Sequence, residues 1–247
     1  MDLEYAITFL KRKGVFMNAV IFDMDGLMFD TERICVLAWD YAGEKMGIGK
    51  AGYMVLKTLG MNRVQTGEMW KREFGEKYDR LGLHKHTQEF MKDYYEENVL
   101  PVKKGLYILL DYLKDSGYKL AVASSSQRAE IEEHLRDARV SEYFQVVIGG
   151  DMIERSKPDP EIYLKACEML NEAPENCYAL EDSKNGLLAA HRAGCIPLMV
   201  PDLWEPDDEI LKIIAGKFDD LEKVKVFFER RPDEILHVPD WEPNGLE

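Results

Sequence analysis

The sequence contains little cysteine, and its few thiols follow no metal-binding or redox pattern. The 247 residues include four cysteines, and none has the Cys-x-x-Cys spacing of a zinc or redox site (Cys35, Cys167, Cys177 and Cys195). This argues against a disulfide-stapled secreted scaffold. We therefore expect reduced thiols and a cytoplasmic protein.

Long apolar runs are also missing, and acids outnumber basic residues. No run approaches the roughly 20 residues that cross a bilayer. The N-terminus lacks the pattern of a signal peptide, because charges at Glu4 and Lys11–Lys13 interrupt it. The 32 lysines and arginines are outnumbered by 46 acids, for a formal net charge of −14, which disfavours nucleic acid as a partner. It would also repel an anionic substrate at long range, so binding of an anion would depend on local cations.

An acid pair near the N-terminus is the most informative feature that is present. Residues 19–22 (Ala-Val-Ile-Phe) are typical of a buried strand in a parallel sheet, and Asp23, Asp25 and Gly26 follow them. Carboxylates in this position lie where open α/β sheets bind ligands. Two carboxylates at the end of one strand repel each other unless a cation lies between them or one of them holds a proton. The alternative is an Asx turn that closes the strand.

A second apolar strand, at residues 119–123, is followed by three serines. Ser124, Ser125 and Ser126 precede a helix that is predicted from Gln127 to about Asp137. Hydroxyl and free N–H groups at a helix start suit an anion such as phosphate. The alternative is that a serine serves only as the N-cap.

A single lysine, Lys157, precedes another predicted helix. Asp159 is the expected N-cap of this helix and Pro160 its first residue. A stiff proline segment would then hold Lys157 where it can direct a fixed positive charge. A lone lysine at such a place is otherwise solvated surface.

A further apolar strand, at residues 177–180, ends in another acid pair, Glu181 and Asp182. A helix follows at residues 187–193, and Gly194 closes it. In one parallel sheet these strand ends open on the same edge. Carboxylate oxygens suit Mg²⁺, and a carboxylate can also attack phosphorus. The combined pattern favours phosphoryl transfer.

Four segments give the chain a resemblance to the haloacid dehalogenase superfamily, in its β-phosphoglucomutase-like phosphatase branch. They occur in the family's order, and the resemblance runs from about Met17 to Val226 (residues 23–32, 122–126, 156–160 and 180–186). It implies an α/β fold, with a Rossmann-like doubly wound parallel sheet as core and an inserted α-helical cap domain. Helical patterns rich in Met, Trp and Tyr after Thr31 agree with such a cap.

The predicted domain boundaries follow from this resemblance and from composition. The α/β core comprises residues 17–30 and 101–228, and the cap comprises residues 31–100. Residues 1–16 form an N-terminal extension with the spacing of a short amphipathic helix, which would be marginal alone. The proline-containing tail at 229–247 looks peripheral. A hydrophobic content of 46% suffices for one full core and a small second domain.

The resemblance implies a role for each matching residue. Asp23 would be the nucleophile and a metal ligand. Asp25 would be the general acid/base, with its backbone carbonyl on the metal. Ser124, Ser125 and Lys157 would hold the phosphoryl group. Dehalogenases of the superfamily lack an acid at the position of Asp25, so this residue argues for phosphoryl transfer.

The resemblance also implies the rest of the site. Asp182 would be a ligand of Mg²⁺, and Glu181 would stand beside it, directly or through water. Arg63 lies in a segment similar to the one that carries the family's substrate-binding arginine, although a solvated arginine is the alternative. His84 and His86 are expected on a solvated helix surface.

One departure from the family bears on the reaction. The β-phosphoglucomutases carry a histidine on the first cap helix, and the corresponding residue here is Cys35. We therefore predict a Mg²⁺-dependent phosphatase of a small phosphorylated metabolite, such as a sugar phosphate, that acts as a monomer or weak dimer. The alternative is a phosphosugar mutase. A non-catalytic metabolite-binding protein is a remote alternative, because it would be expected to have lost an acid or the lysine.

Overall fold

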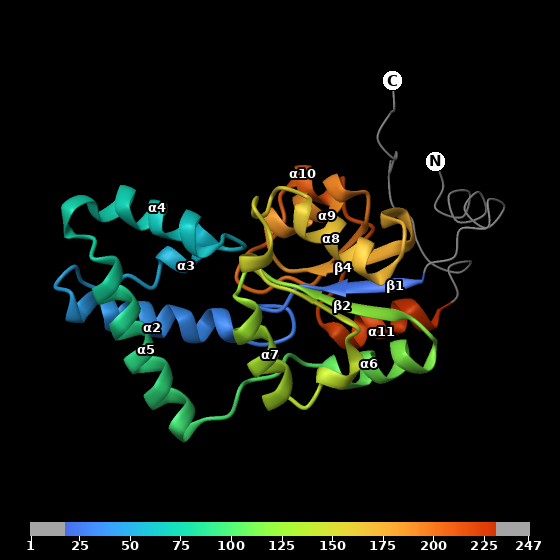
Figure 1. Ribbon diagram of the computed structural model, residues 1–247, viewed down its shortest axis with the longest axis horizontal. Helices are drawn as coiled ribbons and strands as arrows, with labels where there is room; N and C mark the ends of the chain where they lie inside the picture. Colours follow the sequence, from blue (N-terminus) through green and yellow to red (C-terminus); the bar gives the residue numbers. More distant parts are fainter. Residues whose placement is uncertain (1–17, 231–247) are drawn as a thin grey trace.

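The computed structural model describes residues 18–230 of the chain (Figure 1). The predicted N-terminal extension, and with it the amphipathic helix expected at residues 1–16, lies outside the described residues. So does the tail beyond Arg230. Among the described helices, none is both long and apolar enough to cross a bilayer.

Six parallel strands form the centre of the fold. They are β1 (Ala19–Phe22), β2 (Lys119–Ala123), β3 (Val146–Ile148), β4 (Cys177–Glu181), β5 (Ile196–Met199) and β6 (Gly216–Lys217). Their order in the sheet is β3-β2-β1-β4-β5-β6. The order reverses at β1, where the carboxyl ends of the strands leave a crevice for ligands. The predicted doubly wound parallel sheet is confirmed.

Helices cover both faces of this sheet (Figure 1). The helices α6 (Leu106–Asp115), α7 (Arg128–Asp137) and α11 (Leu221–Glu229) pack on one face, and α8 (Glu161–Leu170) and α9 (Lys184–Ala193) pack on the other. Side chains of β1 alternate between these two apolar clusters: Val20 and Phe22 enter the first, and Ala19 and Ile21 enter the second. A strand buried on both faces explains the continuous apolar run in the sequence.

Short elements complete the described core. They are the helix α10 (Asp208–Leu211) and the 3₁₀ turns η2 (Ser141–Tyr143), η3 (Gly150–Met152) and η4 (Pro174–Asn176). Three helix starts differ from the sequence prediction. Helix α7 begins at Arg128, one residue after the predicted start, with Gln127 as its N-cap. The first residue of α8 is Glu161, with Pro160 at the N-cap, although the Asp159 carboxylate still accepts a hydrogen bond from the Glu161 N–H (3.1 Å). Helix α9 begins earlier than expected, at Lys184, because the Ser183 hydroxyl caps it by accepting from the Gly186 N–H.

In the sequence, a second group of helices follows β1 and precedes α6. It comprises α2 (Thr31–Lys45), α3 (Met54–Thr58), α4 (Arg63–Phe74), the 3₁₀ turn η1 (Gly75–Lys77) and α5 (Arg80–Glu97). We call residues 31–97 the helical insertion. It has an apolar cluster of its own, in which the Trp39 and Trp70 rings meet edge to face with centroids 5.1 Å apart. Figure 1 shows the insertion beside the carboxyl edge of the sheet.

The two ends of the insertion lie side by side. Phe29 and Val102 form an antiparallel bridge. The Asp30 N–H donates to the Pro101 carbonyl, and the Lys103 N–H donates to the Met28 carbonyl, each at 2.9 Å. The chain therefore leaves the core and returns to it at one place.

Candidate active site

Three carboxylates cluster at the carboxyl ends of β1 and β4. Asp23, Glu181 and Asp182 are all buried, and each offers an oxygen within 4.8 Å of the other two. The strand register explains the cluster, because Phe22 pairs with Leu180 and the Asp23 N–H donates to the Leu180 carbonyl (3.0 Å). The acids that follow the two strands are thus brought to the same level.

Lys157 is the cation of this cluster. Its ammonium lies 2.5 Å from Asp23 Oδ1 and 2.6 Å from Glu181 Oε1, and it also donates to the Ala123 carbonyl (3.0 Å). Only 1% of Lys157 is exposed, so it is not the solvated lysine of the alternative interpretation. Burial opposes its charge, but the two carboxylates raise the pKa of Lys157.

Glu181 is held on every side. It accepts hydrogen bonds from Lys157, from the Tyr163 hydroxyl (2.6 Å) and from the N–H and hydroxyl of Ser183 (3.3 and 3.1 Å). Gly186 lies against it so closely that a Cβ there would overlap the carboxylate. Glu181 therefore fixes Lys157 in place and has little freedom to turn toward a ligand. The sequence did not identify Tyr163 as a residue of this site, because its spacing is that of a residue on the apolar face of a helix.

Asp23 and Asp182 carry more negative charge than Lys157 can offset. Burial raises the pKa of Asp23 to about 8, and Glu181 and Asp25 add to this, whereas Lys157 lowers it. Burial, followed by Asp23 and Glu181, raises the pKa of Asp182 well above its usual range. A divalent cation at this place would relieve the repulsion, since it favours the ionised carboxylates.

The surroundings of Asp182 fit a cation. Gly26, at φ +83°, has no side chain, and the place that a Cβ would take is a narrow gap between carboxylates. A Cβ there would overlap Asp182 Oδ2 and lie 3.4 Å from Asp202 Oδ2. Asp202 Oδ2 is buried and has no hydrogen-bond partner among the described residues. The other Asp202 oxygen is paired with Lys103 (2.7 Å) and Arg33. The groups that border this gap are carboxylate oxygens, the ligands that hard divalent cations prefer.

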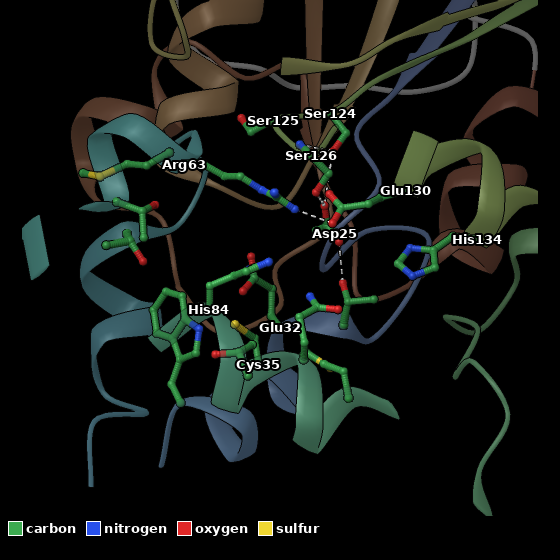
Figure 2. Close-up of a pocket in the computed structure, with 18 of the residues that line it drawn as sticks. Asp25, Glu32, Cys35, Arg63, His84, Ser124, Ser125, Ser126, Glu130 and His134 are labelled. Carbon is green, nitrogen blue, oxygen red and sulfur yellow. Dashed lines mark hydrogen bonds and ion pairs between the residues drawn. The ribbon is translucent and has the colours of Figure 1, made fainter. Parts of the chain in front are cut away.

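Asp25 has different surroundings from Asp23. Its Oδ1 accepts from the Thr31 hydroxyl (2.7 Å), and its Oδ2 accepts from the hydroxyls of Ser124 (3.1 Å) and Ser126 (2.7 Å). Figure 2 shows Asp25 beside Ser124 and Ser126. Ser126 follows Ser124 and Ser125 in the sequence, which predicted no partner for its hydroxyl. Three hydroxyl donors hold the Asp25 side chain apart from the acid cluster.

Four contacts join residues 59–63 of the helical insertion to the core. The Ser125 hydroxyl donates to the Gly60 carbonyl (3.1 Å), and Asn185 Nδ2 donates to the Leu59 carbonyl (3.0 Å). Asn62 Nδ2 donates to the Ser156 hydroxyl, and Arg63 pairs with Glu130. The segment that carries Arg63 therefore lies directly over the serine and lysine loops.

Beside these contacts lies a cavity of about 1210 Å³, lined by both the core and the insertion. Its wall includes Asp23, Asp25, Ser124, Ser125 and Asp182 from the core. The insertion contributes Glu32, Cys35, Arg63 and His84 (Figure 2). His84 is exposed on α5, as expected, and it also borders this cavity.

The Cys35 thiol lies in the cavity wall together with two acids, Glu32 and Asp25. Burial, and then the charges of Glu32 and Asp25, raise the pKa of Cys35 well above its usual range. The thiol therefore stays neutral. His86, in contrast to His84, pairs with Glu89 (2.8 Å) and is not among the cavity-lining residues of the described chain.

Comparison with known proteins places the chain among hydrolases. Residues 20–200 match the family described as haloacid dehalogenase-like hydrolase. The phosphorylated carbohydrates phosphatase of Thermotoga maritima is 34% identical over 72% of this chain and 82% of its own length. The β-phosphoglucomutase of Bacillus subtilis is 31% identical over 72% of this chain and 80% of its own length. The crystal structure of CbbY from Rhodobacter sphaeroides in complex with xylulose-(1,5)bisphosphate superposes with a TM-score of 0.68 at 25% identity, over 83% of this chain and 95% of that one.

Proposed function

Because the chain belongs to the family of haloacid dehalogenase-like hydrolases, we propose that it hydrolyses a small phosphorylated metabolite, such as a sugar phosphate, with Mg²⁺ as cofactor and through an aspartyl-phosphate on Asp23. It is a phosphatase of this family, and relatives named as phosphatases match it over most of their own length. The cofactor, the intermediate and the residue roles are the proposed part.

The observation that carries the mechanism is the difference between Asp23 and Asp25. Asp23 lies in the acid cluster beside Lys157, whereas the Asp25 carboxylate is surrounded by hydroxyl groups. Two carboxylates whose surroundings differ in this way can divide the work of nucleophile and general acid/base. We assign the first role to Asp23 and the second to Asp25.

In the first step a carboxylate oxygen of Asp23 attacks phosphorus, and the bond from phosphorus to the ester oxygen breaks. Asp25 gives its proton to the leaving oxygen. In the second step Asp25 takes a proton from water that attacks the phosphoryl group, and the bond to Asp23 breaks to release inorganic phosphate. Ser124, Ser125 and Lys157 hold the phosphoryl oxygens throughout.

The cofactor would be held by Asp23, the backbone carbonyl of Asp25 and Asp182, with Glu181 beside them. It would supply positive charge that offsets the charge of the phosphate. The remaining buried carboxylate oxygen, Asp202 Oδ2, lies near this place.

Hydrolysis is favoured over the mutase reaction by Cys35. This residue lines the cavity on the first helix of the insertion, at the position expected from the sequence. A neutral thiol with a raised pKa cannot accept and return a proton as a histidine does near neutral pH.

We propose that the helical insertion is the cap that covers the site during transfer. The cytoplasmic location and the monomer or weak dimer remain predictions.

A screen of phosphorylated metabolites tests the function. We expect Mg²⁺-dependent release of inorganic phosphate from at least one sugar phosphate, and loss of this activity in EDTA. β-Glucose 1-phosphate, primed with glucose 1,6-bisphosphate, should give little glucose 6-phosphate. Efficient isomerisation would instead establish the mutase, and release that persists under complete chelation would contradict the proposed cofactor.

A further inference from the structure

Arg63 is the cation that the helical insertion extends toward the serine loop (Figure 2). It is the first residue of α4, whose start is fixed because the Asn62 side chain accepts hydrogen bonds from the N–H groups of Val64 and Gln65. A guanidinium in this place could bind a second anionic group of a substrate. It is instead paired with the carboxylate of Glu130, on α7 of the core.

Glu130 is held independently of Arg63. It is the third residue of α7, and its Oε2 accepts a hydrogen bond from the Gln127 N–H (3.2 Å), which leaves Oε1 for Arg63. Such a capping box fixes the side chain at the helix start. The carboxylate is therefore present at the junction of core and insertion whether or not Arg63 binds it.

The rest of the cavity wall offers little surplus positive charge. Apart from Asp23, Asp25 and Asp182, five acids line it (Glu32, Glu96, Glu130, Glu133 and Asp137). Three arginine and lysine side chains do so (Arg63, Arg80 and Lys92), and Lys92 lies 3.8 Å from Glu96. Counted with neutral His84 and His134, these side chains have a formal net charge of −1 when Glu32 holds a proton. A substrate with charge at both ends would meet repulsion at the end that does not react.

We propose that Glu130 is a specificity residue: by neutralising Arg63, it makes the cavity select phosphate monoesters whose far end carries no second anion, such as the hydroxyl-rich end of a sugar. This inference rests on the proposed phosphatase function and narrows its substrate class. A bisphosphate would have to separate Arg63 from Glu130 and would leave the fixed carboxylate facing a phosphate.

The test compares matched pairs of substrates. The probes are glucose 6-phosphate with glucose 1,6-bisphosphate, and ribulose 5-phosphate with ribulose 1,5-bisphosphate. Glu130→Gln keeps the size of the side chain and an oxygen for the Gln127 N–H, but it removes the charge. We expect the ratio of kcat/KM for bisphosphate over monophosphate to rise roughly three- to tenfold, a range set by the partial exposure of the pair.

Two further variants make the result specific. Glu132→Gln removes a carboxylate from the same helix, where it pairs with Arg128 (2.8 Å) and is not among the cavity-lining residues of the described chain, so the ratio should stay at the wild-type value. In the double variant Arg63→Ala with Glu130→Gln, most of the gain should disappear, because the freed guanidinium is its main cause.

The outcomes separate this inference from the function on which it rests. If Glu130→Gln changes both kcat/KM values by the same factor, the pair only ties the insertion to the core, and the specificity role is overturned while the phosphatase stands. A wild-type ratio that already favours the bisphosphates would also overturn it. If the wild type releases phosphate from none of the probes or the wider metabolite screen, the proposed function fails, and the inference fails with it.

Discussion

The Lys157 ammonium lies 2.5 Å from Asp23 Oδ1, although 134 positions separate the two residues in the chain. Both side chains are buried, and the ammonium also contacts Glu181 at 2.6 Å. A buried ion pair of this kind is weak support for stability as such, because desolvation offsets the attraction. Its significance is chemical, since it places a fixed positive charge beside the carboxylate that we propose as nucleophile.

The first prediction concerns Asp23. Asp23→Asn keeps the size of the side chain but removes the attacking charge, so we expect kcat to fall by at least ~10³-fold, the scale for loss of a nucleophile. Circular dichroism and the melting temperature should show an intact fold. Asp219→Asn, at an exposed position, serves as the control and should keep full activity. Rapid phosphate release by folded Asp23→Asn would remove this residue from the role.

The second prediction concerns Lys157. Lys157→Met would leave Asp23 and Glu181 buried together without their cation, and breaking such a pair lowers the free energy of unfolding by about 3–5 kcal/mol. The loss should be larger at pH 8 than at pH 5, because Asp23, whose pKa is raised to about 8 by burial, takes up a proton at the lower pH. Urea unfolding measures it. Lys184→Met, which breaks a half-exposed pair with Asp207, should lose far less, because solvent screens that pair. Equal losses would show that the buried cation has no special part in stability.

The third prediction concerns Gly26. A Cβ at Gly26 would overlap Asp182 Oδ2, so Gly26→Ala should displace this carboxylate. We expect the Mg²⁺ concentration for half-maximal activity to rise at least about tenfold. This is the scale on which disturbing the residues around a metal site weakens metal binding. Gly117 has a similar φ of +80° and open space within 4 Å of the position that a methyl group would take, so Gly117→Ala isolates the backbone strain of about 1–2 kcal/mol. If both variants keep the wild-type Mg²⁺ requirement, Asp182 is not part of the metal site.

The fourth prediction concerns Glu32 and pH. Burial, and then Asp25, Asp23 and Asp202, raise the pKa of Glu32 from 4.5 to about 8. The folded protein therefore keeps a proton that the unfolded chain has lost between about pH 4.5 and 8, and this group lowers stability as the pH rises through that interval. In metal-free protein, Glu32→Gln should flatten the decline of melting temperature with pH. Glu44→Gln, on the exposed side of the same helix, should leave the decline unchanged. An unaltered slope in Glu32→Gln would contradict the raised pKa.

The sequence could predict which strand ends would meet, because the parallel arrangement follows from their buried apolar runs. Asp23, Ser124 and Asp182 each follow such a run, and they do lie at one edge of the sheet. Lys157 follows no strand, and its position was inferred from a helix start and the resemblance. The structure brings it to the same place.

Contacts between side chains of different elements could not be predicted in the same way. Tyr163 has the sequence spacing of a core residue, yet its hydroxyl donates a hydrogen bond to Glu181. Glu130 has the sequence position of a helix-capping acid, yet it also pairs with Arg63 of the helical insertion. Asp202 did carry a usable signal. It follows the apolar residues 196–200, as the other acids of the site follow their strands, and its unpaired oxygen lies beside Asp182.

The joined ends of the helical insertion have a consequence for how this protein can change over evolution. Since Phe29 and Val102 pair with each other, the residues between them form one closed loop on the core. The entropic cost of closing such a loop depends only weakly on its length, and rises by about 0.6 kcal/mol for each doubling. An exchange of that loop for another helical module would leave β1, its two acids and the returning helix α6 in register. The helical insertion and the acid-bearing edge of the sheet are thus separable parts of one chain, and the first can diverge while the second is retained.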